Sequence, residues 1–258
     1  MIPAQRQKKI LEILSHDEMM SYANLAKKLD VSHMTIRRDI IELEKLGKVS
    51  SVSGGVVLPL HINDEPPYKD KLNANIQQKE TVSYLAVQQI PQESRVIYLD
   101  AGTTCLAIAH KLASRKDLTF LTNDLGTADF LIEHSASQVI FIGGEICKEN
   151  KSSVGEIAAN LIRQVNIDLA FISTSSWDQK GLSTPDARKL AVKKAVVESS
   201  EVNILVSDAS KYGKKAPFHI FPLSVFNQII CDEKLPPIVV SEIKKHNIDV
   251  LIASDKTL

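Results

Sequence analysis

The chain has 258 residues, of which 44% are hydrophobic and 5% aromatic, and 31 basic side chains balance 31 acidic ones. This length allows two domains with a sizeable core, whereas the balanced charge excludes an overall electrostatic attraction to nucleic acid, so that any such binding must come from a local patch. Three widely spaced cysteines without a CxxC pair imply reduced thiols and no metal site, and no cofactor is expected. The chain shows no signal peptide and no apolar run of membrane-spanning length, which predicts a soluble, cytoplasmic protein without a membrane partner.

Three helices are predicted at the start of the chain. Residues 3–15 place Ile10, Leu11 and Leu14 at the spacing of one buried helical stripe. Ser21 caps a short second helix over residues 22–30, and a brief turn leads to a third helix between Ser32 and Gly47. Two short helices joined by such a turn form a helix-turn-helix.

The third helix has two different faces. An apolar face is predicted to pack, and it holds Ile36, Ile40, Leu43 and Leu46. The opposite face is basic near its N-terminal end, and it holds Met34, Arg37, Arg38, Ile41 and Lys45. The alternating valines that follow, around Gly54 and Gly55, predict a small hairpin, so residues 1–58 form a winged helix-turn-helix. On charge and periodicity alone, DNA readout, a solvated face and protein docking all stay open.

Residues 59–71 contain three prolines and no apolar periodicity, which predicts a semi-rigid linker. A helix is expected over residues 72–89, before the break at Pro91. Its apolar stripe could equally be an oligomer seam.

Beyond Pro91, β-branched runs alternate with amphipathic segments. Strands are predicted at residues 95–100, 118–122, 138–143, 169–173, 201–208, 227–232 and 248–254. Helices are predicted at residues 104–112, 125–133, 157–164, 188–198 and 238–245. This alternation predicts a larger Rossmann-like α/β domain over residues 72–258, with a mostly parallel sheet covered on both faces.

Polar residues follow several of these strands, at the edge where open α/β sheets bind ligands. Asp100-Ala101-Gly102-Thr103-Thr104 combines a glycine that lets a ligand approach the backbone with the N–H groups of a helix start, which suits phosphate. The same pattern is also typical of an ordinary N-cap on a tight turn. Similar polar ends follow the next strands, at Thr122 and Asn123, at Gly143 and Gly144, and around Lys211.

The motifs RQKKILEIL, LAKKLDVSHMTIRRDIIELEKLGKV and SGGV resemble the DNA-binding domain of DeoR-type bacterial transcription regulators. In that family the arginines that match Arg37 and Arg38 lie on the recognition helix, and the wing often carries Arg and His where this chain has Ser51 and Ser53. The DNA-contacting residues implied here are Ser32, His33, Met34, Thr35, Arg37, Arg38, Lys45, Lys48 and Ser53.

The motifs DAGTT, TNDL, GGE, SSVG, VKKAVVE and SDASKYG resemble the effector domain of the same family, which is similar to sugar-phosphate isomerases and CoA transferases. In the family these loops bind a phosphorylated sugar or a related metabolite. The implied effector-binding residues are Asp100, Gly102, Thr103, Thr104, Thr122, Asn123, Gly143, Gly144, Lys193 and Lys211. Many members have an acidic residue four places before the lysine that matches Lys193, whereas this chain has Lys189; either Asp186 substitutes for it or the ligand is more acidic than a simple sugar phosphate.

The resulting hypothesis is a transcription regulator, and specifically a repressor of a carbohydrate or sugar-acid operon. Its expected partners are double-stranded operator DNA, a phosphorylated sugar or sugar acid, and further copies of itself in a dimer or tetramer. The alternative is an isomerase-like enzyme that uses Asp100 or Asp208 as general base. No Ser-His-Asp or Cys-His arrangement and no clear pair of carboxylates supports the enzyme.

Overall fold

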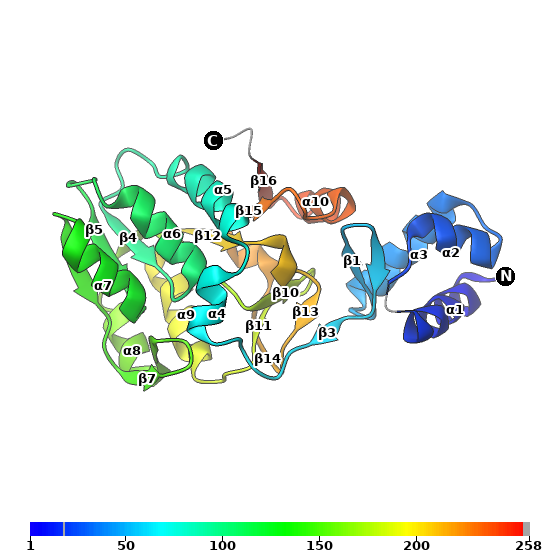
Figure 1. The fold of residues 1–258 in the computed structure, drawn as a ribbon, viewed down its shortest axis with the longest axis horizontal. Helices are drawn as coiled ribbons and strands as arrows, with labels where there is room; N and C mark the ends of the chain where they lie inside the picture. Colours follow the sequence, from blue (N-terminus) through cyan, green and yellow to red (C-terminus); the bar gives the residue numbers. More distant parts are fainter. Residues whose placement is uncertain (18, 255–258) are drawn as a thin grey trace.

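The computed structural model describes residues 1–17 and 19–254, which form a small N-terminal unit and a larger α/β unit (Figure 1). The small unit contains α1 (Pro3–His16), α2 (Tyr22–Leu29), α3 (His33–Lys45) and a hairpin of β1 (Ser50–Val52) and β2 (Gly55–Val57). This is the predicted winged helix-turn-helix. The hairpin lies between the three helices and the α/β unit (Figure 1).

The local signals of the small unit act as predicted. The hydroxyl of Ser32 accepts a hydrogen bond from the backbone N–H of Thr35 at 3.1 Å, and Ser21 caps α2 in the same way. Gly47 ends α3 with a φ of +67°, a conformation that glycine adopts without strain. The apolar face packs into a core with α1, α2 and the hairpin, in which Ile36 and Ile40 are fully buried.

Leu46 differs from its prediction, because it is 55% exposed although the helical pattern placed it on the packed face. The chain reverses at Gly47, and Val49 then fills the core at that end. The apolar pattern continues past the last turn of α3, so it predicts burial for Leu46, where the chain has already turned away from the core.

The segment predicted as a semi-rigid linker, residues 59–71, carries regular structure. β3 (Leu60–His61) pairs in parallel with β13 (Lys214–Lys215). α4 (Tyr68–Asn73) begins directly after Pro66 and Pro67, a place where proline is compatible with a helix, and it buries Tyr68. The expected single helix over residues 72–89 is also interrupted: α4 ends at Asn73, Asn75 adopts a left-handed conformation, and α5 (Ile76–Val87) follows.

All seven strands predicted in the second half of the chain lie in one sheet, and every neighbouring pair is parallel. In sheet order they are β16 (Asp249–Ala253), β15 (Gln228–Asp232), β12 (Ser200–Ser207), β9 (Ile167–Ile172), β4 (Val96–Leu99), β5 (Thr119–Thr122) and β6 (Gln138–Phe141). The near-continuous apolar character of these strands follows from burial on both faces.

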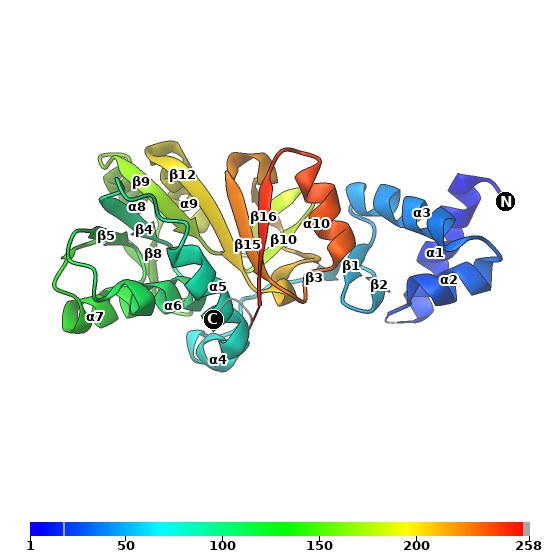
Figure 2. The ribbon, with the colours of Figure 1, turned by 90° about the horizontal axis from the view of Figure 1, so that it is seen from above.

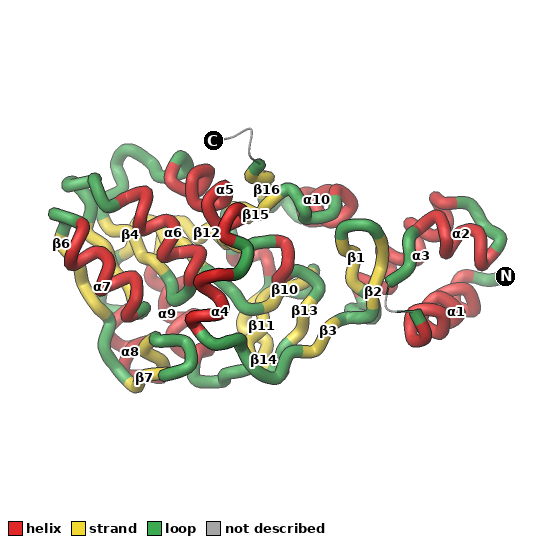
Figure 3. The backbone as a smooth tube through the Cα atoms, in the orientation of Figure 1, coloured by secondary structure: helices red, strands yellow, loops and turns green. Residues whose placement is uncertain are grey.

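Helices cover both faces of this sheet, as Figures 2 and 3 show. One apolar core lies under α5, α6 (Thr103–Leu112) and α7 (Leu125–His134). The other lies under α8 (Gly155–Ile162), α9 (Lys189–Ser199) and α10 (Pro237–Lys244). The five helices predicted beyond Pro91 lie within two residues of their expected bounds.

Shorter elements that the sequence did not predict complete the α/β unit. They are the hairpin of β7 (Glu145–Cys147) and β8 (Ser152–Val154), the antiparallel sheet of β10 (Ser176–Asp178), β11 (Gly181–Thr184) and β14 (Phe218–Phe221), and the 3-10 turns η1 (Ala209–Lys211) and η2 (Leu223–Val225). The antiparallel sheet lies beside β13, between the large sheet and the small unit (Figure 1).

Candidate functional site

The predicted DNA-reading face is open along most of α3. Met34 is 59% exposed, and Arg38 and Lys45 are exposed as well, whereas Thr35 and Arg37 are half-buried. The structure also leaves Ser32, His33, Lys48 and the wing-tip residue Ser53 exposed. These residues surround the exposed side of the helix and the adjoining wing, which is the surface that a winged helix presents to a major groove and its flanking phosphates.

Several members of this set have contacts within the protein. The hydroxyl of Ser32 is engaged with the N–H and the hydroxyl of Thr35. Arg37 borders a groove that the wing shares with residues 233–238 of the α/β unit. Arg38 is therefore the arginine that faces solvent more freely.

Ser51 does not lie on the wing surface, although the family pattern puts a wing residue at this position. It is fully buried, and both its N–H and its hydroxyl donate to the carboxylate of Glu44, at 2.7 and 3.0 Å. A third donor to Glu44 is the hydroxyl of Tyr212 in the α/β unit, at 2.9 Å. Burial raises the pKa of Glu44, because the charged form loses hydration that these three donors replace only in part.

The C-terminal end of α3 thus docks on the loop that follows β12. Lys180 donates to the carbonyl oxygen of Leu46 at 3.0 Å, and Lys215 donates to that of Gly47. Lysines are favourable there because the last carbonyl groups of a helix have no partner within it and carry partial negative charge. The hydroxyl of Ser50 donates to the carbonyl oxygen of Gly213, so the hairpin is fixed to the same loop.

A polar pocket lies at the carboxyl ends of β4, β9 and β12. The chain proceeds from β4 toward β5 on one side of the sheet and from β9 toward β12 on the other, so the strand order reverses at the boundary between β4 and β9. Ligands of open α/β sheets bind at such a reversal. Residues of α4, α9 and the segment that contains Glu65 also line the pocket.

Seven of the ten residues predicted from the effector motifs line this pocket, namely Asp100, Gly102, Thr103, Thr104, Asn123, Lys193 and Lys211. The other three predicted residues do not line it. Thr122 is fully buried below the pocket, where its hydroxyl donates to the carbonyl oxygen of Leu99. Gly143 and Gly144 do not line the pocket, because they follow β6, which is the edge strand of the sheet and lies away from the reversal.

The start of α6 opens into the pocket. Gly102 occupies the N-cap position with a φ of +150°, and no side chain caps the first N–H groups. A Cβ atom at this glycine would lie 2.8 Å from the hydroxyl oxygen of Ser173, so a larger residue would both strain the backbone and press on that side chain. Uncapped N–H groups at a helix start are donors for an anion.

Asp100 and Lys193 form an ion pair at the pocket floor and neutralise each other. Lys193 donates to the carboxylate of Asp100 and, at 2.5 Å, to the carbonyl oxygen of Ser173. The N–H and the hydroxyl of Ser173 also donate to Asp100, at 2.9 and 3.1 Å. Both side chains of the ion pair are more than nine-tenths buried. Lys193 therefore fixes the floor of the site, and its charge is already paired within the protein.

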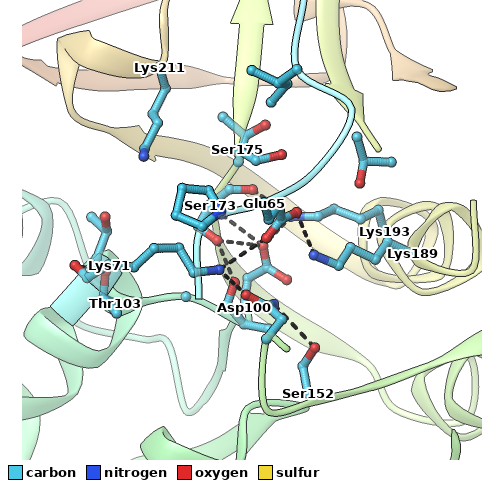
Figure 4. Close-up of a pocket in the computed structure, with 18 of the residues that line it drawn as sticks. Glu65, Lys71, Asp100, Thr103, Ser152, Ser173, Ser175, Lys189, Lys193 and Lys211 are labelled. Carbon is cyan, nitrogen blue, oxygen red and sulfur yellow. Dashed lines mark hydrogen bonds and ion pairs between the residues drawn. The ribbon is translucent and has the colours of Figure 1, made fainter. Parts of the chain in front are cut away.

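Four further lysines that the effector motifs did not single out also line the pocket: Lys71, Lys79, Lys189 and Lys214. Among the described lining residues, six lysines stand against four carboxylates, Asp64, Glu65, Asp100 and Asp208, which leaves a net charge of plus two. Lys211 points into this space and makes no ion pair or hydrogen bond with a described residue through its ammonium group (Figure 4). The pocket is suited to an anion.

Glu65 lies inside the pocket between two of these lysines (Figure 4). Its carboxylate accepts from Lys189 at 2.5 Å and from Lys71 at 3.0 Å, and all three side chains are at least 86% buried. Burial alone would raise the pKa of Glu65, but the two ammonium groups outweigh burial and hold it at about 2. Burial lowers the pKa of Lys71 more than Glu65 raises it.

Some pocket residues that the sequence analysis did not name could have been found from their position after a strand, whereas others could not. Ser173 ends the predicted strand at residues 169–173 and Thr174 directly follows it, so the rule that found Asp100 also applies to them. Glu65 follows no strand, and only the path of the chain over the pocket brings it there.

Comparison with known proteins agrees with both halves of this structure. Residues 6–60 match the DeoR-like helix-turn-helix domain, and residues 74–233 match the DeoR C terminal sensor domain. The chain belongs to the DeoR family. It is a DNA-binding transcriptional regulator, as its small unit and its relatives both indicate.

Three DeoR-family relatives align with nearly the whole of this chain. An uncharacterized HTH-type transcriptional regulator of Haemophilus influenzae is 49% identical over 98% of both chains. The uncharacterized HTH-type transcriptional regulator YgbI of Escherichia coli is 43% identical over 99% of this chain and 100% of its own. The glycerol-3-phosphate regulon repressor of Escherichia coli is 29% identical over 95% of this chain and 97% of its own. In the described part of the chain, no helix is both long and apolar enough to span a membrane.

Proposed function

We propose that this DeoR-family regulator is a repressor of a carbohydrate or sugar-acid operon and that a phosphorylated sugar or sugar acid controls its binding to DNA. Residues 1–58 would bind the operator and residues 72–258 would bind the effector. The observation that carries the proposal is the lysine-rich pocket at the strand-order reversal, into which the uncapped start of α6 opens. The glycerol-3-phosphate regulon repressor supports it, since the name of that relative joins repression to a phosphorylated metabolite.

The effector would place its anionic group near Gly102 and Thr103, with the lysines of the pocket as cationic partners. Among them, Lys211 has no internal carboxylate as a partner in the described part of the chain. Backbone N–H groups and an ammonium group form strong hydrogen bonds to phosphate or carboxylate oxygens. The polar side chains opposite, among them Asn123 and Thr174, would accept or donate to sugar hydroxyl groups.

A thermal-shift screen of phosphorylated sugars, sugar acids and uncharged sugars tests this proposal. Ligand at about 100 times its dissociation constant adds roughly 2.7 kcal/mol to the free energy of unfolding, which is visible as a rise in melting temperature. Lys211→Gln should abolish the rise. Melting temperatures that no anionic compound moves would reject the pocket as an effector site.

We propose that the chain is not an enzyme. A general base needs an accessible carboxylate, but Asp100 already accepts from Lys193 and Ser173, and Asp208 accepts from Asn75 at 3.1 Å and from Ser210. Proton NMR of the protein with sugar phosphates in deuterated water would detect isomerisation or proton exchange. Either of these would favour the isomerase-like alternative.

We also propose an even-numbered homo-oligomer on an inverted repeat. One small DNA-binding unit offers few phosphate contacts, and a second copy on a half-site one helical turn away multiplies the affinity. Footprinting should show two symmetric protected half-sites. A single half-site occupied by a monomer would contradict this.

A further inference from the structure

Glu65 stands out because it is an anion supplied by the protein inside a pocket built for anions. It belongs to the segment between β3 and α4, which connects the two units of the chain. Its side chain is only 12% exposed, and its two carboxylate oxygens each accept from a different lysine, Lys189 and Lys71 (Figure 4).

Two ammonium groups that converge on one carboxylate are the same donor set that would bind a phosphate or carboxylate group of a ligand. Among the described residues, the ammonium group of Lys189 makes no other ion pair, and that of Lys71 adds only a hydrogen bond to Asn150. A phosphate has more acceptor oxygens and more negative charge than the Glu65 carboxylate, so it can compete for both lysines.

The position of Glu65 along the chain links this competition to the DNA-binding unit. Three residues earlier, the N–H of Ile62 donates to the carbonyl oxygen of Lys215 at 2.8 Å, next to the pairing of β3 with β13. Lys215 in turn donates to the carbonyl oxygen of Gly47 at the end of α3. The segment that holds Glu65 in the pocket is therefore attached to the strand on which the DNA-reading helix is docked.

We propose that Glu65 is a tethered internal anion that occupies the effector site between Lys71 and Lys189 until an anionic effector displaces it. Its release frees the segment between β3 and α4, loosens the pairing of β3 with β13, and so changes the docking of the DNA-binding unit. This inference rests on the proposed function, because it assigns a regulatory step to the same pocket.

The test compares wild type with Glu65→Gln, which keeps the shape of the side chain and removes its charge. Asp70→Asn is the matched control, because Asp70 is an exposed carboxylate of the adjacent helix α4 and does not line the pocket. Inorganic phosphate is the probe, with binding measured by calorimetry. Loss of the internal competitor should tighten phosphate binding on the order of tenfold, which corresponds to ~1.4 kcal/mol. Asp70→Asn should bind phosphate like wild type.

A second measurement needs no variant. Hydrogen exchange at the amide of Ile62 should accelerate when phosphate saturates the wild-type protein, and in Glu65→Gln it should already be fast without phosphate. The affinity of Glu65→Gln for a DNA duplex, selected from a random pool on the wild-type protein, should shift in the direction in which phosphate shifts wild type.

The outcomes separate this inference from the proposed function. If wild type and Glu65→Gln bind phosphate equally, and Lys211→Gln does not bind it, the anion site stands and the role of Glu65 is overturned. Slower exchange at Ile62 with phosphate would overturn it as well. If neither wild type nor Glu65→Gln binds phosphate, the anion site fails and this inference fails with it.

Discussion

The contact between Tyr212 and Glu44 should contribute measurably to the docking of the two units, and Tyr212→Phe removes it with little change in packing. The phenol donates to the buried Glu44 carboxylate at 2.9 Å, while its ring packs edge-on against Trp177 with centroids 4.9 Å apart. The substitution keeps the ring contact. A hydrogen bond to a charged group is worth about 1.5–3 kcal/mol, and here the partner stays buried when the bond is lost.

A loss of about 2 kcal/mol corresponds to a fall of roughly 4–8 °C in melting temperature for a chain of this size. Tyr84→Phe is the control, because the hydroxyl of Tyr84 has no hydrogen bond to a described residue. Both variants should be melted by circular dichroism at one pH. The same melting temperature for Tyr212→Phe and the control would refute the assignment of this hydrogen bond as a stabilising contact between the units.

Three further predictions concern the DNA face, the pocket and pH. Arg37→Ala and Arg38→Ala should each weaken binding to the selected duplex by about 1–3 kcal/mol if they contact bases, measured by fluorescence anisotropy on folded protein; unchanged affinity in both would exclude this face. Gly102→Ala and Thr103→Val should both abolish the effector-induced rise in melting temperature, the first through the 2.8 Å approach to a neighbouring hydroxyl, while DNA binding persists; variants that respond like wild type would place the ligand elsewhere. Because the pKa of Glu65 is lowered from 4.5 to about 2, its ion pairs should contribute fully above about pH 4.5 and lose their contribution as pH falls toward 2. The stability difference between wild type and Glu65→Gln, followed by urea unfolding, should shrink over that range, and a constant difference would contradict the ion pairs.

Much of the fold could be predicted because its signals are local. The caps at Ser32 and Gly47 fix the ends of α3, and strands buried on both faces are recognisable as apolar runs whatever their order in the sheet. Leu46 marks the limit of periodicity, since the pattern continues after the chain has turned.

The pocket was predictable only in part. Asp100 and Asn123 were found because strand ends converge at the strand-order reversal, but the same rule included Gly143, since the sequence does not reveal that β6 is an edge strand. Glu65 could not be found, because its approach depends on how a segment without periodicity crosses the pocket. At Lys189, four residues before Lys193, the sequence offered Asp186 as a substitute for the missing acidic residue, but Asp186 pairs with Arg188 and Glu65 pairs with Lys189.

The most direct test of the central claim is the affinity of the wild-type protein for the selected duplex, measured by fluorescence anisotropy while metabolites are added. The account predicts that a phosphorylated or carboxylated sugar changes the dissociation constant by about fivefold or more, a typical coupling between sites. It also predicts that the uncharged sugar has no effect and that Lys211→Gln no longer responds. A dissociation constant that no anionic sugar changes, or that the uncharged sugar changes equally, would contradict the claim that this pocket controls DNA binding.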